Sequence, residues 1–176
     1  EFTMLESNEA YADAEHQRNV IQELFRHVVR GVFGKLQFGY DGNIIDLEQD
    51  FAVMKFPNMT DEEYKQTLRP TLIQPTFLVD YPVAFNPFAK RKADDPSLID
   101  RFQLVIGGVE LVNAFAELND PIDQRERYLE EDKKGKKGDK EISPSDMDLR
   151  NRYDKNRNTI NGASSHRSHH GACRSR

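Results

Sequence analysis

The side chains of Gln103 and Glu110 could bind a charged ligand together, because both carry oxygen atoms and both fall in one short stretch of alternating residues. A carboxylate and an amide oxygen are ligands that Mg²⁺ accepts in combination with phosphate oxygens. The pair could therefore hold a magnesium ion at a phosphate group. The alternative is a solvated polar face on an ordinary half-buried sheet, and spacing alone favours that alternative.

Polar groups also gather at the junction 117–121, whose sequence is Glu-Leu-Asn-Asp-Pro. Asn119 or Asp120 could accept hydrogen bonds from the free amides of a following helix, and the proline suits its first turn. Capping does not explain Glu117 or Asn113, which follow apolar residues. A buried carboxylate needs a partner, and a cationic ligand would be one.

Gln103 and Glu110 lie in a predicted β-hairpin, residues 102–112, that turns at Gly107-Gly108. In this register Gln103 pairs with Val112. Gln103 and Glu110 then share one face of the hairpin, and the other face is wholly apolar.

Asn113 does not fit this alternation, because it falls on the apolar side of the hairpin. A bulge or twist after Leu111 is needed to bring Asn113 round to Glu110. A role for Asn113 beside Glu110 therefore requires an irregularity in the returning strand.

Two segments near the start of the chain would pack beside this hairpin. Apolar residues at three- and four-residue spacings predict a helix over residues 9–34, with Gly34 as a stop signal. Alternating apolar residues on either side of Asp41-Gly42 predict a second hairpin, over residues 36–47.

The middle and the end of the chain supply the remaining elements. Residues 57–71 predict a connector in which Thr60 caps a short helix with Glu63. Residues 72–79 predict a strand interrupted near Pro75, and a charged helix runs from Ile122 to about Glu131. This pattern indicates an α+β fold, an antiparallel sheet flanked by helices.

The composition limits the classes of protein to which the chain can belong. Its 176 residues are enough for one domain of ordinary size, and a net charge of −5 does not indicate a nucleic-acid-binding surface. A single cysteine, Cys173, excludes a disulfide framework and a cysteine-based zinc cluster. No apolar run approaches the length of a membrane span, so we expect a cytoplasmic protein that binds no membrane.

The last residues differ in composition from the rest. Between 149 and 176, seven Lys and Arg residues stand against one acid, and only Leu149 and Ile160 are Leu, Ile, Val or Phe. Such a segment cannot bury enough apolar surface to offset the entropy lost on ordering it. We expect residues 1–148 to fold and residues 149–176 to form a mostly disordered basic tail.

Three blocks of the sequence are more specific than these patterns. They are Glu-Phe-Thr-Met-Leu-Glu at 1–6 with Ala-Tyr-Ala-Asp at 10–13, Leu-Ile-Gln-Pro-Thr-Phe at 72–77 with Pro-Phe-Ala-Lys-Arg at 87–91, and Asp-Arg-Phe at 100–102 with Asn-Ala-Phe-Ala-Glu-Leu-Asn-Asp-Pro at 113–121. These blocks resemble class II lysyl-tRNA synthetases, in which the first closes motif 2 and the third precedes motif 3. Together they span nearly all of residues 1–148.

The resemblance implies an antiparallel sheet with flanking helices and an ATP-dependent ligase reaction. The lysine carboxylate attacks the α-phosphate of ATP and forms lysyl-adenylate, and the lysyl group then passes to the 3′ end of lysine tRNA. Catalysis is mainly positioning and charge neutralisation, so the resemblance assigns no catalytic side chain. The implied ligands and partners are lysine, ATP, Mg²⁺, tRNA and a second subunit.

The resemblance also assigns roles by position: substrate lysine is contacted by Glu6, Asn113 and Glu117, ATP by Glu110 and Leu111, and Mg²⁺ by Glu110 and Gln103. Two positions depart from the family. Asn8 stands where a lysine-contacting tyrosine is usual, and Gln103 stands where a second acidic metal ligand is usual. An amide supplies no charge, so metal affinity is expected to be weaker.

Several family blocks have no counterpart in the 176 residues: the anticodon-binding barrel, motif 1, the start of motif 2, and motif 3. We therefore expect residues 1–148 to be a partial catalytic domain that is inactive alone. One alternative is a synthetase-like paralogue that acts on a protein or serves as an accessory binding module. Another is a structural remnant that binds no ligand.

Overall fold

The computed structural model describes residues 3–136 and 172–175. They fall into two compact units, one made of the residues up to Glu117 together with 172–175, and one that begins at Leu118. The first unit contains a six-stranded sheet and the second contains one helix. None of the described helices is long and apolar enough to cross a lipid bilayer.

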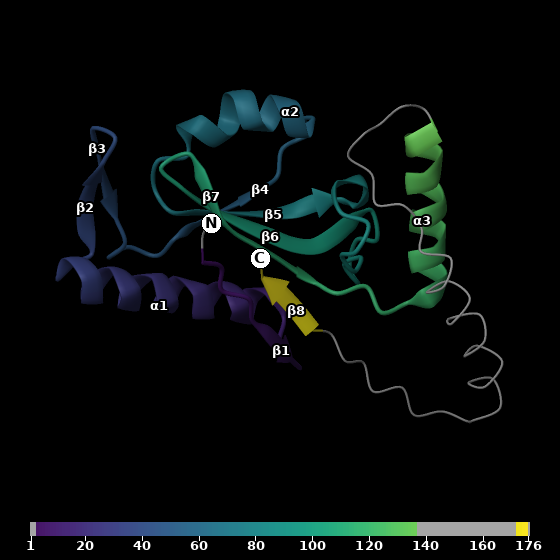
Figure 1. Cartoon of the computed structure of the whole chain (residues 1–176), viewed down its shortest axis with the longest axis horizontal. Coiled ribbons are helices and arrows are strands. Elements are labelled where there is room, and N and C mark those ends of the chain that lie inside the picture. The colour runs from purple at the N-terminus through teal and green to yellow at the C-terminus, as the bar shows by residue number, and fades with distance from the viewer. Residues whose placement is uncertain (1–2, 137–171, 176) are drawn as a thin grey trace. The chain divides into compact units, whose positions relative to one another are not determined.

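The six-stranded sheet is almost entirely antiparallel (Figure 1). Its strands, in spatial order, are β1 (Asn8–Ala10), β8 (Ala172–Ser175), β7 (Val109–Ala116), β6 (Leu98–Ile106), β5 (Thr76–Pro82) and β4 (Ala52–Lys55). The α+β class predicted from the sequence is confirmed. The sheet is nevertheless mixed, because β4 runs parallel to β5 at the edge.

One face of the sheet is covered by α1 (Ala14–Phe33), with the hairpin of β2 (Gln37–Tyr40) and β3 (Asn43–Asp46) beside it (Figure 1). The helix ends at Gly34, which takes the left-handed conformation at φ 70°, as its position predicts. The hairpin turns at Asp41-Gly42, where both residues have positive φ, as predicted. The predicted helix was too long at its start, because residues 8–10 form β1.

The other face is covered by the connector between β4 and β5 (Figure 1). The connector contains α2 (Asp61–Glu63), a π-helical turn η1 (Tyr64–Leu68) and a 3₁₀ turn η2 (Arg69–Thr71), and a further 3₁₀ turn, η3 (Val83–Phe85), follows β5. The predicted cap is confirmed, since Thr60 and Glu63 bond each other reciprocally. The strand predicted over 72–79 begins only at Thr76, after Pro75.

Each face has its own hydrophobic core. Against α1 the core includes Ile21, Leu36, Ile45, Phe77, Phe102 and Leu104. Under the connector it includes Phe56, Tyr64, Leu78, Tyr81, Val105 and Phe115. The second core is rich in aromatic rings, and Phe56 stacks on Tyr81 with 4.4 Å between the ring centroids.

The expected tail, 149–176, lies outside the described residues except for 172–175. Those four residues form β8, which pairs with β1 on one side and β7 on the other. Main-chain hydrogen bonds to two neighbouring strands do not require an apolar sequence, so the composition of the tail did not indicate β8. The mostly disordered tail itself stays a prediction. The boundary at 148 stays a prediction.

The second unit is built on α3 (Pro121–Lys136), which is longer than the predicted helix. The side chain of Asp120 accepts hydrogen bonds from the amides of Ile122 and Asp123, at 2.8 and 3.4 Å. This confirms helix capping for the end of the polar junction. Within the helix, the buried guanidinium of Arg127 makes two hydrogen bonds to Asp123, at 3.0 and 2.8 Å.

Candidate functional site

The candidate site is set by a bulge in the hairpin of β6 and β7. The hairpin turns at Gly107-Gly108 as predicted, and Val105 pairs with Glu110. The register then shifts, so that Gln103 pairs with Asn113 rather than with Val112. The predicted pairing with Val112 was therefore wrong, whereas the predicted irregularity near Leu111 is confirmed.

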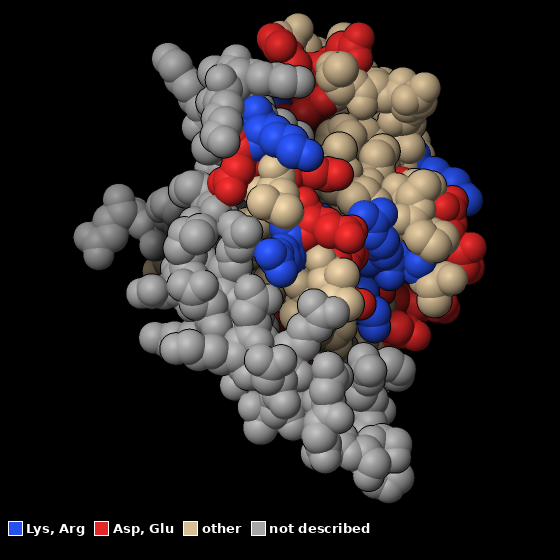
Figure 2. All heavy atoms as spheres, turned by 90° about the vertical axis from the view of Figure 1, so that its right-hand side faces the viewer, with Lys and Arg blue, Asp and Glu red and all other residues tan. Residues whose placement is uncertain are grey.

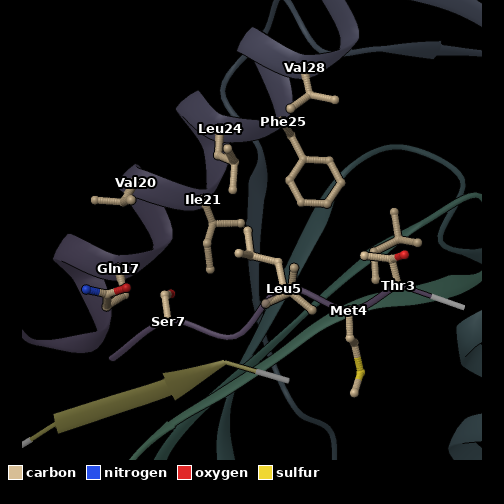
Figure 3. Close-up of a pocket in the computed structure, with 12 residues that line it drawn as sticks. Thr3, Met4, Leu5, Ser7, Gln17, Val20, Ile21, Leu24, Phe25 and Val28 are labelled. Atoms are coloured by element: carbon tan, nitrogen blue, oxygen red, sulfur yellow. The ribbon is translucent and has the colours of Figure 1, made fainter. Parts of the chain in front are cut away.

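Because of the bulge, the side chains of two consecutive residues, Leu111 and Val112, both lie on the α1 side of the sheet. Val112 is buried in the core against α1, and Leu111 is 47% exposed. Both residues line an apolar groove of about 350 Å³ whose other walls are α1 and the residues Thr3, Met4, Leu5 and Ser7 (Figure 3). The side chain of Leu111 is thus on the opposite side of the sheet from Glu110, and its predicted contact with ATP stays a prediction.

On the connector side, Gln103 links two other polar residues. Its Oε1 accepts a hydrogen bond of 2.6 Å from Tyr81 Oη, and its side chain also bonds Glu110. An ionised carboxylate can only accept hydrogen bonds, so the amide nitrogen of Gln103 is the atom that faces Glu110. The amide oxygen is occupied by Tyr81.

Arg101 ties Asn113 into the same face. Its Nε donates to Asn113 Oδ1 at 3.0 Å, and a terminal nitrogen donates to the carbonyl of Phe85 at 3.2 Å. The guanidinium lies over the ring of Tyr81, 4.6 Å from its centroid. Burial lowers the pKa of Arg101 from its usual value, although an arginine stays protonated at neutral pH.

Glu110 is half-buried between positive charges. Burial raises the pKa of its carboxyl group, while Arg101, Arg69 and the hydrogen bond from Gln103 act in the opposite direction. Burial also raises the pKa of Tyr64 to about 12, and the negative charge of Glu110 adds to this increase. Tyr64 and Arg69 come from the connector, so two distant segments of the chain meet at this carboxylate.

Two buried polar atoms of the connector have no hydrogen-bond partner among the described residues. They are Tyr64 Oη and Arg69 Nε. Both are donors, and a buried donor without an acceptor is costly. Neither residue could be predicted from the sequence as part of the site, because nothing in the local pattern of the connector indicates that it folds over Glu110.

The other predicted lysine contacts lie elsewhere on the sheet. Glu117 is half-buried just after β7, where its backbone pairs with Ala89. Glu6 is exposed in the segment before β1, and β8 separates β1 from β7. The structure therefore brings Gln103, Glu110 and Asn113 together. Glu117 instead follows the end of β7, and Glu6 precedes the start of β1.

The donors around Glu110 do not fit a magnesium site. Gln103 presents its amide nitrogen rather than an oxygen, and Arg69 and Arg101 place two positive charges near Glu110. Mg²⁺ requires oxygen ligands, and nearby guanidinium groups repel it. Among residues 3–136 and 172–175, no group of three or more His, Cys, Asp or Glu residues could hold a metal ion.

The described surface that Figure 2 shows carries charges of both signs. Where Figure 2 shows described residues, Lys and Arg side chains lie next to Asp and Glu side chains. That view of the described surface contains no extended region of one sign.

Comparison with known proteins identifies the family of the chain. Residues 1–154 match the family model described as class II tRNA synthetases (D, K and N). Similar proteins include lysine–tRNA ligases of Pelotomaculum thermopropionicum (37% identity, covering 86% of this chain and 38% of the relative), Carboxydothermus hydrogenoformans (38% identity, 84% and 38%) and Thermotoga maritima (33% identity, 85% and 37%). The chain spans about two fifths of the length of these relatives. Since the family model matches most of its residues, the chain belongs to the class II tRNA synthetases of the D, K and N group.

Proposed function

We propose that this chain is part of a lysine–tRNA ligase and that the connector side of β6 and β7 holds lysine and ATP. The observation that carries this proposal is the bulge at Leu111, which places Asn113 beside Gln103 and Glu110. The names of the similar proteins support lysine as the amino acid and favour the ligase over a paralogue that acts on a protein.

In the proposed reaction, a carboxylate oxygen of lysine attacks the α-phosphorus of ATP. A new oxygen–phosphorus bond forms, the bond to the bridging oxygen of the β-phosphate breaks, and pyrophosphate leaves. The chain would contribute by fixing the two reactants next to each other, which removes much of the entropic cost of the reaction. The lysyl group would then pass to the 3′ end of a tRNA.

The polar side chains divide between the two ligands. Asn113, Glu117 and Glu6 would contact lysine, with the carboxylate of Glu117 facing the side-chain ammonium group, because a desolvated cation needs an anionic partner. Glu110 and the backbone around Leu111 would lie at the nucleotide. Arg101 would hold Asn113 in place through its hydrogen bond of 3.0 Å.

The remaining partners follow from the same proposal. A tRNA is the acceptor of the lysyl group, and the cytoplasm is where such an acceptor is charged. A second subunit is proposed from the resemblance to homodimeric synthetases. We assign no step to Mg²⁺ at Gln103 and Glu110, because the donors there do not fit it.

Calorimetric titration of the purified 176-residue chain tests the choice of amino acid. Lysine, aspartate and asparagine are titrated separately, because the family includes synthetases for all three. The proposal predicts that lysine binds more tightly than the other two. Tighter binding of aspartate or asparagine, or no binding of lysine, would contradict it.

A further inference from the structure

The connector is held in place over the polar face by the hairpin turn of β6 and β7. The amides of Gly107 and Gly108 donate to the carbonyls of Ile73 and Leu72, at 2.9 and 3.0 Å. A Cβ atom on Gly108 would lie 3.3 Å from the Cα of Pro70, so the two backbones pass very close to each other. These contacts place Arg69, the residue before Pro70, next to the start of β7.

The charges that meet at this place are predominantly positive. Among the charges of the described residues that act on Glu110, Arg101 and Arg69 are positive, and Asp61 is negative but paired with Lys65 in the connector. Two guanidinium groups against one free carboxylate leave an excess of one positive charge. A half-buried site of this kind attracts an anion more strongly than a metal cation.

The unpartnered donors indicate what the anion must provide. Tyr64 Oη and Arg69 Nε both carry a hydrogen atom and have no acceptor within the described part of the chain. Phosphate oxygens are strong acceptors and match the planar arrangement of N–H groups in a guanidinium. The two atoms are covered by protein, whereas Arg69 as a whole is half-buried, so an anion would reach both atoms only if the connector shifted.

The connector has a conformation suited to such a shift. Residues 64–68 form a π-helical turn, whose wider hydrogen-bonding pattern is uncommon and often found at functional sites. Arg69 begins the 3₁₀ turn that follows, so two irregular turns meet at this residue. A small change between them would move Arg69 without unfolding the sheet beneath.

We propose that Arg69, supported by the charge of Arg101, binds the polyphosphate of a nucleotide directly beside Glu110, so that this site binds polyphosphate without Mg²⁺. This inference rests on the proposed function, because it assigns the triphosphate of ATP to a particular place. It differs from the role that the resemblance implies for Gln103 and Glu110, which was to hold a metal ion.

The test is a calorimetric titration of the 176-residue chain with inorganic tripolyphosphate and with ATP, in EDTA and in excess Mg²⁺. Both ligands are predicted to bind at least as tightly in EDTA. Arg69→Gln is predicted to weaken both by about ten-fold or more, the usual effect of losing a charge-assisted hydrogen bond. Arg30→Gln, an exposed arginine on α1, removes the same charge elsewhere and is predicted to bind as the unmodified chain does.

Two results would overturn the inference: binding of tripolyphosphate that requires Mg²⁺, or equal affinities for Arg69→Gln and Arg30→Gln. If Arg69→Gln fails to fold, Arg69→Lys decides, because it keeps the charge and loses the planar pair of donors. Weaker binding by Arg69→Lys supports the inference, and unchanged binding overturns it.

Lysine titrations on the same variants separate this inference from the proposed function. Loss of tripolyphosphate binding with lysine binding intact supports Arg69 as the polyphosphate residue. Tripolyphosphate binding that depends on Arg69 in a chain that binds no lysine supports the inference and contradicts the proposed function. Lysine binding with no effect of Arg69→Gln on ATP supports the function and overturns the inference.

Discussion

Gln103 lies directly opposite Asn113 across β6 and β7, because Leu111 is the extra residue of a bulge between them. A regular hairpin would have turned Asn113 toward α1 and the apolar core. The bulge instead gives Gln103, Glu110 and Asn113 one common face under the connector. The chemistry proposed for this face depends on that one-residue shift.

Introducing a carboxylate at position 103 should make the binding of polyphosphate at this site depend on Mg²⁺. In Gln103→Glu, a second carboxylate replaces the amide group that now faces Glu110, so the pair gains affinity for Mg²⁺. Binding of tripolyphosphate should then become weaker in EDTA and recover when Mg²⁺ is added. Gln103→Leu, which removes the amide without adding charge, is the control and should show no such recovery. Equal binding by Gln103→Glu with and without Mg²⁺ would contradict the charge argument.

Removal of the hydroxyl group should lower the free energy of unfolding at one buried tyrosine, Tyr81, and should not lower it at another, Tyr64. Tyr81→Phe leaves Gln103 Oε1 buried without its donor and should lower the free energy of unfolding by about 1–3 kcal/mol. Tyr64→Phe removes a buried hydroxyl for which the described residues provide no partner, and it should leave stability unchanged or raise it by about 1 kcal/mol. Urea denaturation measures both values, and Tyr40→Phe serves as an exposed control. A larger loss in Tyr64→Phe than in Tyr81→Phe would show that the assignment of partners is wrong.

The pH dependence of stability should differ in sign between Glu110 and Asp80. Burial raises the pKa of Glu110, so the folded protein binds its proton more tightly than the unfolded chain does, and ionisation costs stability as pH rises above the unfolded value near 4.5. Burial alone would raise the pKa of Asp80, but hydrogen bonds from Lys92 and Lys55 outweigh it, and the pKa of Asp80 is lowered. The ionised carboxylate of Asp80 therefore stabilises the folded protein at pH values above its unfolded-state pKa near 3.8. This stabilisation is lost as the pH falls through the lower pKa of Asp80 in the folded protein.

Denaturation curves of Glu110→Gln and Asp80→Asn across the acidic range measure these two contributions. Relative to the unmodified chain, Glu110→Gln should become more stable as pH rises, and Asp80→Asn should become less stable. Parallel curves for the two variants would contradict the proposed environments.

The elements that the sequence predicted well are those whose cause is local. The turn at Asp41-Gly42 needs two residues with positive φ, and the spacing of apolar residues in α1 follows directly from helix geometry. Thr60 and Glu63 form a capping box that depends on four consecutive residues. Each of these features can be recognised without knowledge of the rest of the chain.

The features that were missed depend on contacts between distant segments. Leu111 and Val112 are both apolar, so the pattern could indicate that a bulge was needed but could not fix the register. Tyr64 and Arg69 belong to a polar connector, and only folding places them over Glu110. The strand at 172–175 pairs through its backbone, which leaves little trace in composition.

The central claim is that lysine and nucleotide occupy separate parts of one face, and calorimetry on Glu117→Gln tests it most directly. Breaking a desolvated ammonium–carboxylate pair costs about 2–5 kcal/mol, so lysine affinity should fall by about thirty-fold or more. ATP affinity should stay within about two-fold, and Glu48→Gln, an exposed glutamate, should change neither affinity. An unchanged affinity for lysine, or an equal loss of affinity for ATP, would contradict the account.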